Sequence, residues 1–567
     1  MNKFFISFGA AALASTLSAC AATAPRHPGS VSFIVNFARG KHRISRYIYG
    51  INTPQQQAGQ PNPGLDRRAY RGIPFTFIRL GGDRWSAYNW TTNASNAGKD
   101  WRFSNDDYLD RSHQPGDAVR SFLRSAAKAH AAALITVPII GYLAADEDGP
   151  LKLAPPATSP HFVREYPSRK AAGGHAKPHA VFQSQFVRWV KAHFPNGFKR
   201  RSRSPIYFSL DNEPAIWAGS HPEVHPQPTT YTELLRKSIA YASMIKKIAP
   251  HALVYGPADY GWEGFRTLQN APDSARYNRA VDPRTDQPFG NFLSFYLERM
   301  RQAGHKAGRR LLDVLDIHWY PEAQGRDRAG KMVRIMYANA SPGVVAARLQ
   351  APRSLWDPHY VENSWITRNM HHHPIDLLAR LKREIAHNYP GTKLSVSEYD
   401  YGAGNSISGG IAEADVLGIW GRYGLYSAAE WPLLNKEPFI LGAFRMYRNY
   451  NGHGGRFGAT AVAASTGNNY ATSIYASVTR RGQAVLVLLN KTSRPIKAAV
   501  ALRHAPRRYA TFRAYLLTAH SPLNKGGYSA LPTAESTHAE PISKLRNLTL
   551  PAYSVTTLAL HENRNGR

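Results

Sequence analysis

Two glutamates end apolar, strand-like segments and have the residue type that acid–base and nucleophilic chemistry uses. Glu213 follows Ile206–Leu210 in the segment Asp211-Asn212-Glu213-Pro214, and Glu398 ends the run Leu394–Glu398. Pro214 stops the first strand, because proline has no N–H to give to a ladder. Two carboxyl groups flanking one bond are what glycoside hydrolysis requires, one donating a proton to the leaving oxygen and the other attacking the anomeric carbon. Taken alone, either acid has a structural alternative, which is to cap the helix that follows.

The two acids belong to a regular alternation of strand-like and helical segments. Amphipathic helices such as Asp117–Ala132 and Tyr231–Ile248 separate most of the apolar runs. Eight runs have the length of buried strands: Tyr47–Asn52, Phe75–Leu80, Ala133–Ile140, Ile206–Leu210, Leu253–Tyr255, Val314–His318, Leu394–Glu398 and Ser427–Trp431. Strand–helix alternation repeated to eight predicts an α/β fold, a (β/α)8 TIM-like barrel. The two glutamates then end strands four and seven and face each other across the C-terminal mouth, where such barrels place their chemistry.

Other polar residues end the same strands or follow them closely. Asn212 is placed to bind a sugar hydroxyl beside the reacting carbon, and Arg79 to hold Glu398 ionised through a charge-assisted pair. His318 and Tyr320 are expected to line the same mouth, and Asn52 ends the first barrel strand. Each has a structural alternative, such as a barrel salt bridge for Arg79 or a hydrogen-bonded core histidine for His318.

Aromatic residues make up 11% of the chain, which is ordinary for a core and also suits a protein that stacks sugars or bases. Several aromatics fall in predicted mouth-side loops or at strand ends and are candidates for substrate binding: Trp85, Tyr88, Trp90, Trp262, Trp356, Trp365 and Trp431. Because Trp is highly buried on average, we expect about half of them to belong to the core. Trp431, at the end of the eighth strand, is the best candidate for the subsite that holds the scissile bond.

Five long segments resemble glycoside hydrolase family 44: YFSLDNEPAIW, LDVLDIHWYPEAQG, RSLWDPHYVENSWI, SVSEYDYGAGNSISGGIAEADVLGIWGRYG and RLGGDRWSAYNWTTNASNAGKDW. The resemblance implies a TIM-like barrel with a β domain and a retaining mechanism. It also implies that Glu213 is the acid/base and Glu398 the nucleophile. This chain departs from the pattern expected of the family at Asp83, where we expect Asn, and at Ala459, where we expect Asp.

The resemblance implies a retaining endo-β-1,4-glucanase that hydrolyses xyloglucan and related soluble β-1,4-glucans with two glutamates. One alternative is the same fold acting on mannan, xylan or another β-1,4-linked polysaccharide. A second is a surface protein that binds carbohydrate without catalysis, although the presence of both glutamates argues against it. The substrate is thus a β-glucan polysaccharide, and we expect a monomer.

The sequence changes character after the barrel. Short alternating strands and turn-rich segments follow from about residue 461, which predicts a C-terminal antiparallel β domain. The N-terminal strand 31–46 precedes the first barrel strand and is expected to join that domain. The predicted organisation is therefore signal peptide 1–19, linker 20–30, N-terminal strand of the β domain 31–46, barrel 47–445 and β-sandwich-like domain 446–567.

The N-terminus has the features of a secretory signal. Lys3 supplies a positive charge, residues 4–17 are largely apolar, and the run ends in Leu17-Ser18-Ala19-Cys20, which resembles a bacterial lipobox. Cys20 is the only cysteine, so it has no disulfide partner within the chain and is a candidate for lipidation. We therefore expect an exported cell-envelope lipoprotein, in the periplasm or at the cell surface. Ordinary cleavage near residues 22–24 and secretion is the alternative.

The chain carries 71 basic and 38 acidic side chains, a net charge of +33. Such a charge suits a polyanion-binding surface protein, but the basic clusters are dispersed and form no nucleic-acid-binding motif, so nucleic acid is not the expected partner. Contact with a membrane is expected only through the lipid. No phosphate loop or dinucleotide fingerprint is present, and no cofactor is expected to be required. Asp146 and Asp148 offer oxygen ligands for a structural Ca2+, with a solvated acidic turn as the alternative.

Overall fold

The computed structural model describes residues 29–52, 72–152, 157–277, 291–431, 437–521 and 535–562. The predicted signal peptide and Cys20 lie outside the described residues. Within the described part of the chain, no helix is both long and apolar enough to cross a bilayer.

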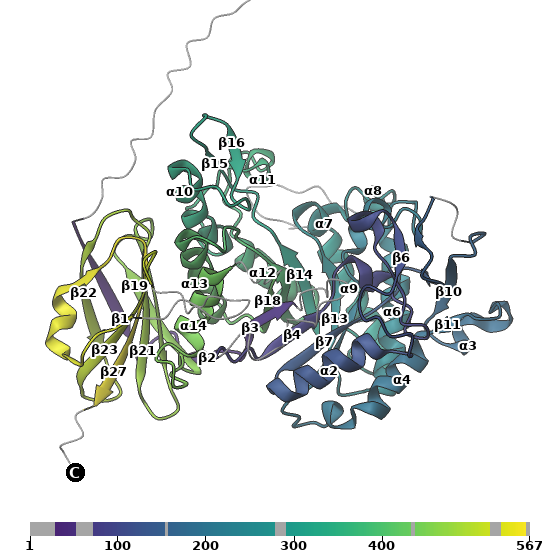
Figure 1. The fold of residues 1–567 in the computed structure, drawn as a ribbon, viewed down its shortest axis with the longest axis horizontal. Helices are drawn as coiled ribbons and strands as arrows, with labels where there is room; N and C mark the ends of the chain where they lie inside the picture. Colours follow the sequence, from purple (N-terminus) through teal and green to yellow (C-terminus); the bar gives the residue numbers. More distant parts are fainter. Residues whose placement is uncertain are drawn as a thin grey trace, which may run out of the picture.

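Eight parallel strands close into a barrel, which confirms the predicted α/β architecture (Figure 1). In chain order they are β3 (Tyr47–Asn52), β4 (Phe77–Leu80), β7 (Ala132–Val137), β12 (Ile206–Leu210), β13 (Val254–Asp259), β14 (Val314–Trp319), β17 (Lys393–Tyr399) and β18 (Ser427–Glu430). Neighbours in this list pair with each other, and β18 pairs with β3 to close the ring. Glu213 follows the fourth strand and Glu398 belongs to the seventh.

The helices between the strands cover the outside of the barrel (Figure 1). The main ones are α2 (Asp117–Ala129), α4 (Gln183–His193), α6 (Tyr231–Ile248), α9 (Asn291–Lys306), α12 (Leu377–Asn388), α13 (Ile407–Arg422) and α14 (Pro438–Arg448). Helix α6 begins where the Thr230 side chain accepts a hydrogen bond from Glu233 N at 3.0 Å, which is N-capping. Helix α14 extends past residue 445, where the barrel was expected to end, and buries one face against the β domain strand β27 (Ser554–Glu562).

Helix α13 is apolar nearly all round, because it is buried between the barrel and the β domain. Residues 408–421 are all buried, and the helix contacts β3 on one side and strands β20 (Thr472–Val478) and β21 (Ala484–Asn490) on the other. Asp415 on this helix accepts a hydrogen bond from Tyr475 at 2.6 Å and pairs with Lys491 at 3.4 Å. A Cβ on Gly418 would lie 2.2 Å from the Tyr475 ring, so only glycine permits this close approach.

The β domain lies beside the barrel and is built around one large sheet (Figure 1). Its long strands include β1 (Ser30–Asn36), β19 (Thr460–Thr466), β22 (Ile496–Arg503) and β23 (Tyr509–Leu517), besides β20, β21 and β27. Strand β1 pairs in parallel with β22 and antiparallel with β19, so the N-terminal strand joins this sheet as predicted. Alternate residues of β1 are buried, as in Val31, Phe33 and Val35, and form part of a core separate from that of the barrel.

The amino-terminal end of the barrel interior is filled by apolar and aromatic side chains. Residues at the starts of the strands form one cluster of buried side chains: Phe77, Ala132, Leu134, Tyr207, Tyr255, Val314 and Ala429. The Phe77 ring stacks on the Tyr255 ring with the centroids 6.3 Å apart, and Tyr255 stacks on Tyr207 at 5.9 Å. This layer fills the amino-terminal end of the barrel, and the polar groups lie at the carboxyl-terminal mouth.

Candidate active site

The turn after β12 aims Glu213 into the mouth. Asp211 and Glu213 both have left-handed backbone conformations, with φ of 67° and 45° respectively, which residues other than glycine rarely adopt. The buried Asp211 carboxylate stabilises this turn by accepting hydrogen bonds from Ile139 N at 2.5 Å and Asn212 N at 2.8 Å. Pro214 then begins a short 3-10 helix, as proline at a first helical position does readily.

Glu398 projects from β17 and is held from two sides. Arg79, on β4 and 0% exposed, contacts Glu398 Oε1 at 2.5 Å. The Tyr320 hydroxyl donates to Glu398 Oε2 at 2.9 Å. Arg79 itself is oriented by two amide oxygens, those of Asn52 at 3.0 Å and Asn212 at 2.7 Å. Amide oxygens from β3 and from the turn after β12 thus hold the Arg79 guanidinium in a charge-assisted pair with the Glu398 carboxylate.

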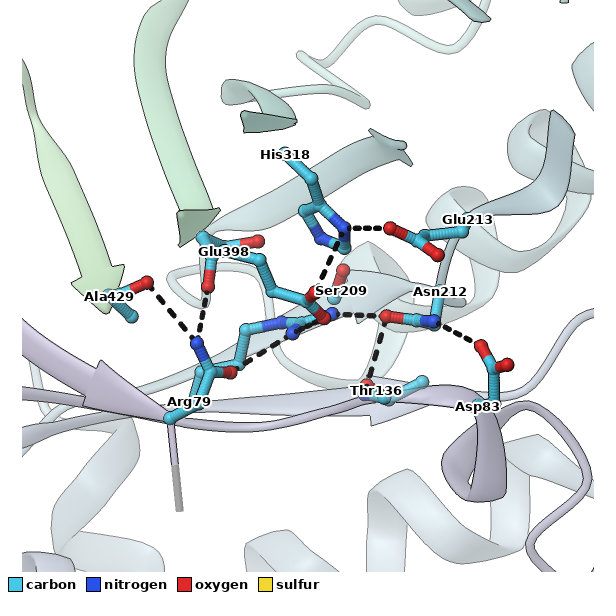
Figure 2. Close-up of polar contacts among 12 residues, drawn as sticks. Arg79, Asp83, Thr136, Ser209, Asn212, Glu213, His318, Glu398 and Ala429 are labelled. Atoms are coloured by element: carbon cyan, nitrogen blue, oxygen red, sulfur yellow. Dashed lines mark hydrogen bonds and ion pairs between the residues drawn. The ribbon is translucent and has the colours of Figure 1, made fainter. Parts of the chain in front are cut away.

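His318 lies between the two glutamates (Figure 2). Its Nδ1 is 2.7 Å from Glu213 Oε1 and 3.4 Å from Glu398 Oε2. The atoms that these three side chains direct at one another lie within 4.8 Å of each other. The two carboxyl groups are therefore close enough to act on one bond.

Burial favours the uncharged forms of both Glu213 and His318. Loss of hydration raises the pKa of Glu213 to about 7; the Arg79 charge opposes this shift and Asp100 adds to it. Burial also lowers the pKa of His318 to about 4, so the imidazole is neutral near pH 7. Glu213 thus contacts a neutral imidazole, whereas Glu398 pairs directly with the Arg79 guanidinium.

A cavity of about 480 Å3 opens over the two glutamates. Of the residues predicted to bind substrate, five line it: Asn212, Trp262, Tyr320, Trp365 and Trp431. Asn52, Arg79 and His318 are fully buried beneath the carboxylates, so their role is to position other groups and not to form the cavity wall. The Asn212 amide also donates to Asp83 Oδ1 at 3.1 Å, which leaves its orientation fixed on both sides.

Four predicted aromatic sugar contacts lie outside the residues that line the cavity. Trp85 and Tyr88 are buried in the barrel core and pack on each other with centroids 4.7 Å apart. Trp90 packs against Phe186, and Trp356 stacks on Tyr423. Burial removes Trp85 and Tyr88 from the candidate sugar contacts, which corrects the sequence interpretation. A sugar contact of the partly buried Trp90 and Trp356 stays a prediction.

Sequence reasoning missed several residues of the cavity wall: Asp83, Asp100, Tyr260, Trp319, Glu322 and Arg334. Tyr260 directly follows β13 and Trp319 ends β14, so strand-end position could have found both. Burial raises the pKa of Asp83 to about 8, with His221 opposing the shift and Glu213 adding to it. Glu322 and Arg334 pair at 2.8 Å on the opposite wall. The wall is therefore rich in carboxyl groups.

The predicted metal ligands lie outside the cavity. Asp146, Asp148 and His161 have ligand atoms within 4.8 Å of one another. His161 Nδ1 is 2.8 Å from Asp146 Oδ2, and Asn105 donates to the other Asp146 oxygen at 3.0 Å. Both Asp146 oxygens thus have protein partners, and the carboxylates fit a hard cation only if His161 turns away. A structural Ca2+ there stays a prediction.

The sequence matches a known enzyme family over part of the barrel. The family model described as "Glycoside hydrolase family 44" matches residues 94–323. The xyloglucanase of that family from Paenibacillus polymyxa, solved with xyloglucan, superposes with a TM-score of 0.81 at 32% identity, covering 94% of this chain and 100% of that one. The chain belongs to glycoside hydrolase family 44. A family 44 endoglucanase structure from Clostridium thermocellum also gives a TM-score of 0.81 at 32% identity, covering 94% of this chain and 100% of that one.

Two curated proteins are related to this family 44 chain over most of its length. Endoglucanase A of Paenibacillus lautus is 36% identical over 475 residues, or 81% of this chain. A protein named beta-mannanase/endoglucanase A, from Caldicellulosiruptor saccharolyticus, is 35% identical over 525 residues, or 87% of this chain. The matches span 64% and 36% of those proteins' own lengths, so both relatives contain further sequence.

Proposed function

We propose that this family 44 protein is a retaining endo-β-1,4-glucanase that hydrolyses xyloglucan and related soluble β-1,4-glucans by double displacement. The observation that supports it most is the convergence of Glu213 and Glu398 on His318, with facing atoms within 4.8 Å. Retaining glycosidases place their carboxyl groups about 5–5.5 Å apart, whereas inverting enzymes need a wider gap for a water molecule.

In the first step Glu213 donates its proton to the glycosidic oxygen as the bond to the anomeric carbon breaks. The Glu398 carboxylate attacks that carbon from the other face and forms a glycosyl ester. In the second step the Glu213 carboxylate accepts a proton from water, the water oxygen attacks the anomeric carbon, and the ester bond to Glu398 breaks. The surroundings match these roles, because burial favours protonated Glu213 and the Arg79 guanidinium pairs with the Glu398 carboxylate.

No metal or organic cofactor takes part in these steps, because protein groups supply both the proton and the nucleophile. Product stereochemistry tests the mechanism: 1H NMR of early cello-oligosaccharide products is expected to show the β-anomer first. An α-anomer formed first would contradict the double displacement.

The substrate proposal is tested by comparing initial rates on xyloglucan, unbranched β-1,4-glucan, mannan and xylan. The relatives named above include a xyloglucanase and a beta-mannanase/endoglucanase, so the panel separates the main proposal from its nearest alternative. Higher kcat/KM on the two glucans than on mannan and xylan is expected. Glucan binding without release of reducing ends would instead indicate a non-catalytic binding protein.

We also propose that the protein is exported, lipidated at Cys20 and otherwise monomeric. The support is the charged and apolar N-terminal run ending in Leu17-Ser18-Ala19-Cys20. Mass spectrometry of the N-terminal peptide from membranes of an expressing bacterium is expected to show a diacylglyceryl-modified Cys20, and Cys20→Ala is expected to move the protein to the soluble fraction. An unmodified peptide beginning after residue 22 would indicate ordinary secretion.

A further inference from the structure

Trp101 is unusual among the tryptophans of the chain. All eleven lie within the described residues, and Trp101 is the only one among the exposed large hydrophobic side chains, at 58% exposure. A single exposed apolar side chain is common on protein surfaces and needs no explanation by itself. The position and support of Trp101 are what distinguish it.

Trp101 directly follows Asp100, which lines the active-site cavity. The two residues belong to a 3-10 turn, η2 (Gly98–Trp101), between the paired strands β5 (Ser95–Asn96) and β6 (Ser104–Asp106). The indole is exposed directly beside a wall residue of the cavity that holds Glu213 and Glu398, and the Arg102 guanidinium lies 5.4 Å from its ring centroid.

The turn that presents the indole is firmly held. The buried Asn96 side chain accepts from Gly98 N at 2.7 Å and donates to Phe103 O at 3.0 Å, while Phe103 N donates to Gly98 O at 2.9 Å. A Cβ on Gly98 would lie 2.3 Å from Ser220 O, so the turn packs directly on the neighbouring helix α5 (Trp217–Ser220). The exposed ring thus has a rigid base, which reduces the entropy lost when a ligand orders it.

The size of the cavity requires contacts beyond it. A cavity of about 480 Å3 has room for one small ligand. A polysaccharide that places one bond between Glu213 and Glu398 must continue across the rim, where its sugar rings need apolar faces to pack on. Trp offers a large, rigid ring at low conformational cost.

We infer that Trp101 is a distal sugar-binding platform that takes one ring of a β-1,4-glucan chain outside the cavity. This inference rests on the proposed function for the identity of the ligand, but it concerns binding and not the chemical step. The platform adds affinity for polymers and adds none for oligosaccharides short enough to fit within the cavity.

Trp101→Ala tests the inference, with Tyr470→Ala as a matched control. Tyr470 is 39% exposed and lies in the turn between β19 and β20, outside the residues that line the cavity. With the wild-type protein as reference, Trp101→Ala is expected to raise KM for polymeric xyloglucan about tenfold, a loss of about 1.4 kcal/mol, with kcat within about twofold. Trp101→Phe is expected to recover part of the loss, and Tyr470→Ala to change neither constant.

Binding measured without turnover separates this inference from the proposed reaction. In a Glu398→Gln background, affinity gel electrophoresis in xyloglucan is expected to show weaker retardation for Trp101→Ala, while calorimetry with cellotriose shows no change. Equal retardation with and without Trp101 would overturn the platform, even if hydrolysis proceeds as proposed. Weaker retardation in a protein that releases no reducing ends would support the platform and overturn the hydrolysis.

Discussion

The two ends of the barrel are built from the same eight strands and have opposite chemistry. At the amino-terminal end, Phe77 and Tyr255 belong to a layer of buried apolar and aromatic rings. At the carboxyl end, only two residues along β4 from Phe77, the fully buried Arg79 contacts Glu398 at 2.5 Å. One strand therefore supplies a stability residue at its start and a functional residue near its end.

The two ends contribute with opposite sign to the stability of the fold. Burying a ring releases water and stabilises the barrel. Burying a carboxyl such as Glu213 works against folding unless the group stays protonated or gains a partner, and its pKa rises to about 7 for this reason. The left-handed backbone at Asp211 and Glu213 adds local strain at the same end. Burial of the apolar end therefore offsets the destabilising groups that the reaction requires at the mouth.

The largest expected effect comes from removing the nucleophile at the mouth. Glu398→Gln keeps the shape of the side chain but cannot form the glycosyl ester, so kcat on xyloglucan is expected to fall about 10^4-fold or more. Circular dichroism is expected to show an intact fold, since Arg79 keeps the amide oxygens of Asn52 and Asn212 as acceptors. Residual activity within tenfold of the wild type would exclude Glu398 as the nucleophile.

The opposite end is expected to respond in stability alone. Phe77→Ala removes a fully buried ring from the lower layer, and the free energy of unfolding is expected to fall by about 3–5 kcal/mol. The kcat of the molecules that remain folded is expected to stay within about twofold, because Phe77 is at the far end of β4 from Glu398. Denaturant unfolding and active-site-normalised kinetics measure the two quantities. A large drop in kcat per folded molecule would contradict the separation of the two ends.

The two ends also differed in how far the sequence predicted them. The period and length of the apolar runs were enough to predict all eight barrel strands, because a strand buried on both faces requires apolar residues throughout. Strand ends were enough to propose Glu213 and Glu398 for the mouth. The aromatics were harder, because Trp85 and Trp365 both belong to short helices, α1 (Asp83–Ser86) and α11 (Trp365–Asn369), yet one ring packs in the core and the other lines the cavity. That choice depends on tertiary packing, which has no local signal.

The same limit explains the missed residues Asp100 and Asp211. Asp100 reaches the cavity through a turn between two short strands, β5 and β6, far from any barrel strand end. Asp211 stands within the motif that contains Glu213, but its carboxylate turns back to bind the backbone at Ile139. Neither direction follows from residue type or spacing.

Arg79 offers a test at the border between stability and function. Arg79→Lys keeps the positive charge but loses the planar fork that contacts Glu398, Asn52 and Asn212 together. We expect kcat/KM to fall about 10²–10³-fold, the range found for losing one preorganised electrostatic contact. Arg380→Lys is the matched control, because Arg380 is a buried arginine on α12 that binds backbone carbonyls away from the cavity. Equal losses for both variants would mean that Arg79 acts only through stability.

The smallest effect expected at the mouth is a shift in the pH profile. The first step needs protonated Glu213, so kcat/KM is expected to fall as pH rises through about 7. The negative charge of Asp100 contributes to that raised pKa, and Asp100→Asn therefore makes loss of the Glu213 proton easier. The alkaline limb is expected to move to lower pH by less than about one unit, while the control Glu540→Gln in the β domain leaves it in place. A limb that stays in place or moves to higher pH would show that Asp100 does not act on Glu213, and that burial alone sets the proton affinity of the acid/base.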